Sequence, residues 1–182
     1  MLFLLFQLGK DRYALEASRV VEVVPLLALK QLPQAPEGVA GIFNYRGRPV
    51  PAIDLCALTL GHPASERLST RIIIVNFPDA GANHLVGLVA EKATATLRKD
   101  ARDFVEPGPR TAPYLGPVLM DSNGPIQWVH EQRLLSEPLR EVLFAKSVES
   151  NATARGQSSL GRRNSPSPYP LPQGEGGQPS LG

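Results

Sequence analysis

Short apolar runs separated by turn residues fill most of the chain before its last fifty residues. Residues 2–8 form one such run, and residues 12–16 alternate polar and apolar positions as a half-buried strand does. Gly9, Lys10 and Asp11 between them have the chemistry of a turn, so the pattern predicts an opening hairpin. Many short strands with regularly spaced turns are typical of an all-β barrel or sandwich, which is the fold class we expect.

A second hairpin is predicted around Gly47. Apolar residues 39–45 and 49–55 flank this glycine, which readily adopts the positive φ of a tight turn. Residues 20–24 are apolar around Glu22 and fit either a strand or a short helix, because periodicity does not separate the two.

Two further hairpins and a helix complete the predicted domain. The β-branched run at 69–77 is predicted to pair with residues 85–89 across a turn. Residues 114–120 are predicted to pair with residues 125–130 through an Asn-Gly turn. Beyond them, apolar positions three or four apart predict a helix that Pro138 interrupts or restarts.

The end of the chain has a different composition. Half of residues 151–182 are Gly, Pro or Ser, and few are apolar. Such a segment cannot bury enough surface to offset the entropy lost on ordering, so we predict one domain over residues 1–148 and a disordered tail over residues 149–182. The Pro-rich run at 165–172 also fits a docking peptide of the PxxP type, and composition leaves this alternative open.

Charge and cysteine content exclude several classes of protein. Residues 151–182 hold three arginines and one glutamate, which account for the whole formal net charge of +2, so residues 1–150 are neutral. A phosphate backbone requires clustered Lys and Arg, and we therefore expect no nucleic-acid partner. Cys56 is the only cysteine, which excludes an internal disulfide and a multi-cysteine metal site. The apolar runs are too short for a signal sequence or a membrane span, so we expect a cytoplasmic protein without membrane insertion.

Few side chains indicate catalysis or ligand binding. Glycine motifs for nucleotides are absent and the histidines lack metal-ligand spacing, so we predict no catalytic residue, no metal and no cofactor. Asp54 follows an apolar run, where it fits a catalytic carboxylate or, more simply, the cap of the next helical turn. The alternative function is a small β-barrel enzyme or ligand-binding protein, with Asp54, His84 and His130 as its polar set.

The most distinctive segment runs from residue 38 to residue 55 and reads G-V-A-G-I-F-N-Y-R-G-R-P-V-P-A-I-D-L. It places Asn44 and Arg46 at a hairpin tip. An arginine there can hold a carboxylate through two hydrogen bonds, on a partner or within the domain. The alternative is that Asn44 and Gly47 only make the turn and that Arg46 is solvated.

This segment resembles the signature of CheW-like domains, commonly N-L-R-G followed by a strand that ends in D-L. The similarity continues on both sides in the family's order and stops before the tail. It includes residues 6–8, Tyr13, residues 20–23, Leu32 and Pro33, residues 70–75, 86–89 and 114–116, and Leu134 with Leu135.

The resemblance implies two small SH3-like barrels of five strands that share a core, with short helices that include one near the C-terminus and an apolar groove between the barrels. It also implies a non-enzymatic adaptor without a cofactor. Members of the family couple the cytoplasmic tips of methyl-accepting chemoreceptors to the regulatory domain of a CheA-type histidine kinase. We therefore expect the protein in the cytoplasm, at membrane-associated receptor complexes.

The resemblance also implies a set of partner-binding residues: Val20, Glu22, Asn44, Tyr45, Arg46 and Gly47. Arg46 is expected on the receptor-facing side, with Glu22 as its ion-pair partner and Val20 on the same surface. Tyr45 stands where the family usually has Leu, and we expect it to alter the groove and thus which receptor is accepted. The hairpin sequence is more similar to adaptors of accessory pathways, such as Wsp-type surface sensing, than to the flagellar adaptor.

Overall fold

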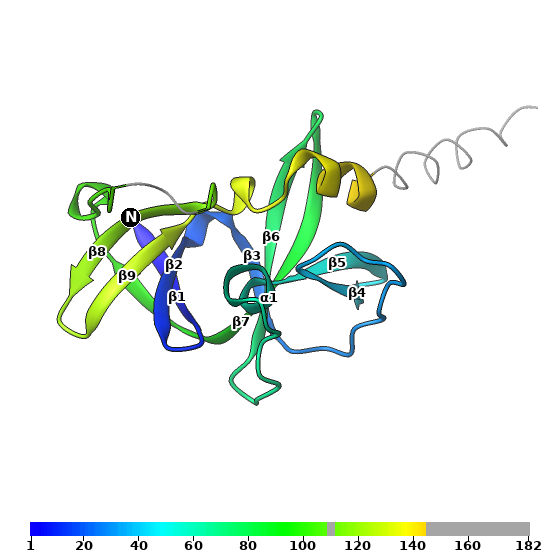
Figure 1. Ribbon diagram of the computed structural model, residues 1–182, viewed down its shortest axis with the longest axis horizontal. Helices are drawn as coiled ribbons and strands as arrows, with labels where there is room; N and C mark the ends of the chain where they lie inside the picture. The colour runs from blue at the N-terminus through cyan, green and yellow to red at the C-terminus, as the bar shows by residue number, and fades with distance from the viewer. Residues whose placement is uncertain (109–111, 145–182) are drawn as a thin grey trace, which may run out of the picture.

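Within residues 1–108 and 112–144, which the structure describes, the chain forms nine β-strands and a few short helical segments (Figure 1). The structure is a computed structural model. The strands are β1 (Leu2–Leu8), β2 (Asp11–Glu16), β3 (Val20–Pro25), β4 (Val39–Tyr45), β5 (Arg48–Asp54), β6 (Arg71–Asp79), β7 (Ala82–Arg98), β8 (Leu115–Asp121) and β9 (Gly124–Val129). The helical segments are α1 (Leu55–Leu60), the 3₁₀ turns η1 (Ala17–Arg19), η2 (Ala101–Asp103) and η3 (Glu131–Arg133), and residues 137–144. The predicted all-β class is confirmed, whereas the predicted tail lies outside the described residues.

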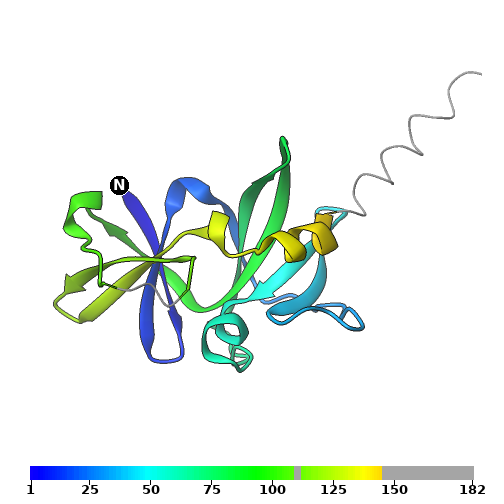
Figure 2. The ribbon, with the colours of Figure 1, turned by 45° about the horizontal axis from the view of Figure 1, so that its top comes forward.

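The long strand β7 belongs to two barrels. Its first part pairs with β5 and β6, from Ala82 to Ala90, and its last part pairs with β1 as far as Arg98. Strands β1, β2, β8 and β9 join the last part of β7 in what we call the first barrel, and β3, β4, β5 and β6 join the first part of β7 in the second barrel (Figure 2). The chain therefore has the two five-stranded, SH3-like barrels that the resemblance implies.

A hydrophobic cluster shared by both barrels joins them. It includes Phe6 from β1 and Ile73 from β6, which are 2% and 0% exposed. Two smaller clusters each fill one barrel, around Phe43 and around Phe3. Burying a side chain of this size contributes about 1.5–3 kcal/mol. The shared cluster confirms the expected common core and packs the barrels as one unit.

Two strands differ in detail from the sequence-based prediction. Strands β6 and β7 extend into the predicted turn and leave only Ala80 and Gly81 between them, with φ values of 46° and 82°. Positive φ at both positions is what a tight two-residue hairpin requires. The ambiguous run at 20–24 is a strand, because it pairs antiparallel with β6.

The C-terminal segment crosses from the first barrel to the second (Figures 1 and 2). After β9, the turn η3 leads to helical residues 137–144, where Phe144 enters the shared cluster and stacks on His84 at 4.2 Å between ring centroids. The regular helix begins later than the predicted start at residue 131. Pro138 explains this, because it lacks an amide N–H and fits only the first turn of a helix.

Candidate functional site

The hairpin between β4 and β5 turns at two residues, Arg46 and Gly47, which lie between the paired Tyr45 and Arg48. Their φ values are 52° and 81°, as a type I′ turn requires. Asn44 secures the turn, because its side-chain oxygen accepts a hydrogen bond from the Gly47 amide at 2.8 Å. The left-handed conformation costs a non-glycine residue about 1 kcal/mol, so Arg46 is held at the tip by its surroundings.

Arg46 and Glu22 form the expected ion pair, with 2.9 Å between Arg46 Nη2 and Glu22 Oε2. The two residues are 24 positions apart in the chain and meet because β3 runs past the hairpin. The Arg46 side chain is still 74% exposed and that of Glu22 38%. Surface pairs of this kind contribute at most about 1 kcal/mol to folding, so this pair does more to position Arg46 than to stabilise the domain.

Tyr45 contacts both members of the ion pair. Its hydroxyl donates a hydrogen bond to the same Glu22 oxygen that binds Arg46, and its ring lies 5.1 Å from the Arg46 guanidinium carbon. The hydrogen bond to Glu22 raises the pKa of the Tyr45 hydroxyl, burial adds to the rise, and the positive charge of Arg46 opposes it. The hydroxyl therefore stays protonated and donates at neutral pH.

The sequence does not predict this contact. The resemblance implies that Tyr45 binds the partner and alters the groove, and its hydroxyl also lies against Glu22, 23 residues earlier in the chain. A tyrosine within a motif that commonly has Leu was the one available signal, since the hydroxyl of a buried tyrosine usually finds a hydrogen-bond partner.

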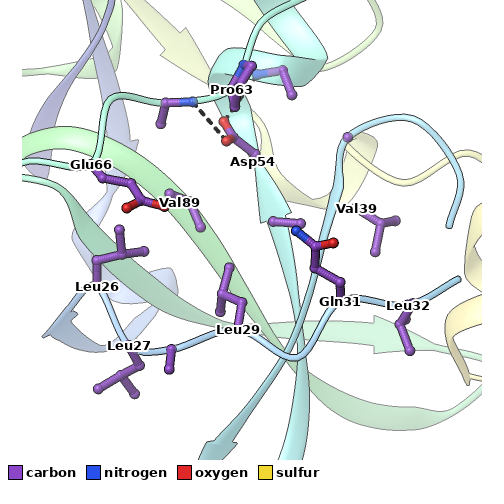
Figure 3. Close-up of a pocket in the computed structure, with 15 residues that line it drawn as sticks. Leu26, Leu27, Leu29, Gln31, Leu32, Val39, Asp54, Pro63, Glu66 and Val89 are labelled. Atoms are coloured by element: carbon purple, nitrogen blue, oxygen red, sulfur yellow. Dashed lines mark hydrogen bonds between the residues drawn. The ribbon is translucent and has the colours of Figure 1, made fainter.

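A groove of about 610 Å³ lies on the second barrel, between the chain that follows β3 and the chain that follows α1 (Figure 3). Its walls combine apolar side chains, among them Leu26, Leu29 and Val89, with polar groups of Gln31 and Glu66. The resemblance implies an apolar groove between the barrels, but this groove is formed within one barrel, by its long connection from β3 to β4. The sequence of that connection has no periodic pattern from which its path could be predicted.

A family model matches most of the described chain. It is the model of the CheW-like domain, and it matches residues 2–139, from β1 into the C-terminal helical segment. The chain belongs to the CheW-like domain family. The resemblance that starts from the hairpin motif at residues 38–55 is thereby confirmed.

Individual relatives of known sequence or structure also support membership of this family. Two curated relatives named chemotaxis protein CheW, from Helicobacter pylori and Klebsiella aerogenes, are 29% and 28% identical over 110 residues. These matches cover 60% of this chain and 63% of each relative, so the chain spans less than two thirds of the curated relatives it matches. The crystal structure of the scaffolding protein TtCheW from Thermoanaerobacter tengcongensis matches with a TM-score of 0.67 at 25% identity, over 74% of this chain and 87% of that chain.

Within this CheW-like domain, Val20 lies apart from the ion pair. The register between β3 and β6 shifts between Val20 and Glu22, which marks a β-bulge. Val20 packs against the shared cluster, while Glu22 reaches the hairpin tip. Val21, at 45% exposure, is the large apolar side chain that this part of β3 offers to solvent. A partner contact at Val20 stays a prediction.

The polar set of the alternative function is not brought together. Asp54 pairs in register with Val89 on β7, and His84 lies five residues from Val89, roughly 16 Å along the strand. His130 follows β9 in the other barrel and packs against Trp128 at 5.2 Å. Catalysis requires groups within hydrogen-bond reach, so these residues do not form a site.

Asp54 has the simpler of its two predicted roles. Its carboxylate caps α1 by accepting hydrogen bonds from the amides of Cys56 at 2.8 Å and Ala57 at 3.1 Å. Its second oxygen accepts from the Ala64 amide at 2.8 Å, at the edge of the groove (Figure 3). Burial raises the pKa of the neighbouring Cys56 thiol to about 11, so the only cysteine is protonated and unreactive at neutral pH.

Among the residues that the structure describes, no helix is long and apolar enough to span a bilayer.

Proposed function

We propose that this chain is a non-enzymatic chemosensory adaptor that couples methyl-accepting chemoreceptors to a CheA-type histidine kinase. Its membership of the CheW-like family supports this function, as do the relatives named chemotaxis protein CheW and a structural neighbour described as a scaffolding protein. The observation on the chain itself that carries the proposal is Arg46, fixed at a hairpin tip by Glu22 and 74% exposed.

The receptor contact follows from the chemistry of the tip. Arginine presents several N–H donors in a rigid fork, and Glu22 uses one nitrogen of Arg46. A receptor tip is a helical hairpin, which can lay an apolar face on the domain while Arg46 fixes the register through a charge-assisted bond. The kinase regulatory domain binds a separate surface of the same packed unit, because coupling requires two sites on one body.

Size-exclusion chromatography tests the adaptor function. The full chain is mixed with the cytoplasmic hairpin of a receptor and the regulatory domain of a kinase from the same pathway, and we expect all three to co-elute. Co-elution with the kinase domain alone contradicts the receptor half of the proposal. Binding to neither folded partner contradicts the adaptor function.

The domain boundary and the pathway are also parts of the proposal. The adaptor domain spans residues 1–148, so a chain that ends at residue 148 should bind both partners as the full chain does. The hairpin motif favours an accessory pathway of the Wsp surface-sensing type. Deleting the gene in the source organism should then change the response to surfaces and leave swimming intact, and the fluorescently tagged protein should gather at receptor clusters.

A further inference from the structure

Tyr45 contacts both members of the ion pair in different ways. Its hydroxyl donates to Glu22 Oε2, the oxygen that also accepts from Arg46 Nη2 at 2.9 Å. Its ring lies 5.1 Å from the guanidinium carbon of Arg46, within the range of a cation–π contact. The three side chains therefore form a closed triangle in which each contacts the other two.

We infer that Tyr45 is a positioning residue, which holds Arg46 in the conformation that binds a carboxylate of the partner; this rests on the proposed receptor-binding function. An exposed arginine normally samples many rotamers, and a partner that binds it must order the side chain first. Arg46 is 74% exposed yet held on two sides, by the Glu22 carboxylate and by the Tyr45 ring. That ordering is complete before the partner arrives.

The hydroxyl of Tyr45 has a second effect, on Glu22. Glu22 uses one nitrogen of Arg46, so a carboxylate of the partner can bind the other N–H groups without Arg46 changing its conformation. The partner then competes with Glu22 for the charge of the guanidinium, and the hydrogen bond from Tyr45 compensates Glu22 for the weaker attraction. A leucine here, as is usual in the family motif, has no hydroxyl and cannot make this bond. Tyr45 therefore lowers the free-energy cost of sharing Arg46 between Glu22 and the partner.

The charge of the tip identifies the chemistry of the partner group. Arg48, the residue that pairs with Tyr45 in the hairpin, is exposed and forms no ion pair in the part of the chain that the structure describes. With Glu22 and Arg46 neutralising each other, the tip keeps one positive charge. Opposite charges steer association, so the tip selects an acidic side chain on the partner helix.

The decisive variant is Tyr45→Phe, compared with the natural chain. It removes the hydroxyl and keeps the ring in the hydrophobic cluster around Phe43. Tyr114→Phe is the matched control, because the Tyr114 hydroxyl contacts Thr59 of α1 at 3.2 Å, away from the tip. In the full chain without a partner, the ¹⁵N heteronuclear NOE of Arg46 Nε reports how firmly the side chain is held. We expect it to fall in Tyr45→Phe toward the value of Arg102, whose side chain is 93% exposed, and to be unchanged in Tyr114→Phe.

The second readout is affinity for the receptor cytoplasmic hairpin. We expect Tyr45→Phe to weaken binding about 3- to 10-fold, the range that one typical hydrogen bond contributes, because Tyr45 acts on the partner only through Arg46. In an Arg46→Ala background the same substitution should have no effect, because Tyr45 acts through Arg46. An effect of equal size in both backgrounds would show a merely structural role and overturn the inference.

The remaining outcomes separate this inference from the proposed function. If Arg46→Ala weakens receptor binding and Tyr45→Phe changes neither the affinity nor the NOE, the positioning role is wrong and the receptor site stands. If Arg46→Ala leaves receptor binding intact, the proposed receptor site at Arg46 is wrong. The role of Tyr45 in positioning Arg46 for the receptor is then wrong as well. A fall in the NOE without any loss of affinity also overturns the inference.

Discussion

Two arginine–carboxylate pairs, one in each barrel, have the same length and opposite surroundings. Arg12 and Asp121 tie β2 to the end of β8 at 2.9 Å, with side chains 21% and 22% exposed. Arg46 and Glu22 meet at the same 2.9 Å, with side chains 74% and 38% exposed. The N–O distance therefore says little about what a pair does. The sheltered pair stabilises the first barrel, and the exposed pair leaves a charged group available to a partner.

The largest effect is expected from reversing the charge at the tip. Arg46→Glu should weaken receptor binding at least ~30-fold, since an interface arginine of this kind contributes about 2 kcal/mol or more. The free energy of unfolding should change by no more than about 0.5 kcal/mol, because the side chain is exposed. Calorimetric titration with the receptor hairpin measures the first quantity and urea unfolding the second.

Arg48→Glu is the matched control, because it places the same charge change on the same hairpin. It should weaken binding several-fold less than Arg46→Glu does. Equal losses in the two variants would mean that the total charge of the tip matters and that the Glu22–Arg46 geometry does not.

The next largest effect is expected on stability, from substituting the buried carboxylate of Asp54. Asp54→Ala removes the acceptor for three backbone amides and should lower the free energy of unfolding by about 2 kcal/mol. Asp54→Asn keeps a capping oxygen and should lose less. Urea unfolding measures both, and a loss from Asn that equals the loss from Ala would contradict the capping role.

A smaller effect is expected from exchanging the exposed pair. Glu22→Arg places two arginines together at the tip, and adding Arg46→Glu should restore part of the stability lost. The coupling free energy in a double-mutant cycle is expected to be about 0.5 kcal/mol. A coupling free energy of zero in urea unfolding would show that the ion pair does not stabilise the free protein.

The smallest effects are in the pH dependence of stability, where two carboxyls act in opposite directions. The hydrogen bond from Arg12 lowers the pKa of Asp121 below 3.8, so its contribution is complete above that pH and is lost as the pH falls through the lowered pKa. Burial raises the pKa of Glu131 above 4.5, so its protonation favours the folded state and stability falls as the pH rises through the raised pKa.

Variants separate these two contributions in urea titrations at several pH values. Asp121→Asn should flatten the loss of stability at acidic pH, and Glu131→Gln should flatten the loss toward neutral pH. If either variant keeps the pH profile of the natural chain, the corresponding carboxyl is not the titrating group.

Local features of the sequence were sufficient for the hairpins. The turn at Gly47 is specified by neighbouring residues, and the β-branched composition of β6 is typical of a buried strand. The predicted Asn-Gly hairpin also forms, but its two turn residues are Ser122 and Asn123, since its glycine already pairs with Asp121. The cap at Asp54 follows for the same reason, since its acceptor and donors are two and three residues apart.

The missed features depend on contacts between distant residues. Tyr45 contacts Glu22 because a bulge in β3 turns Glu22 toward the hairpin. The residue types at these positions do not predict that shift in register. The groove follows the path of the long connection between β3 and β4, which lacks periodicity. The Glu22–Arg46 pair could be predicted only from the family resemblance, because that resemblance relates positions that are far apart in the chain.

Measuring the two pairs side by side separates a binding role from a stabilising one. Arg12→Ala and Arg46→Ala, each in the full chain, are assayed for affinity toward the receptor hairpin and for the midpoint of urea unfolding. We predict a crossover, in which Arg46→Ala loses affinity for the receptor hairpin and keeps its unfolding midpoint, whereas Arg12→Ala has a lower midpoint and keeps its affinity. Wild-type affinity in Arg46→Ala, measured with a receptor that binds the natural chain, would contradict it.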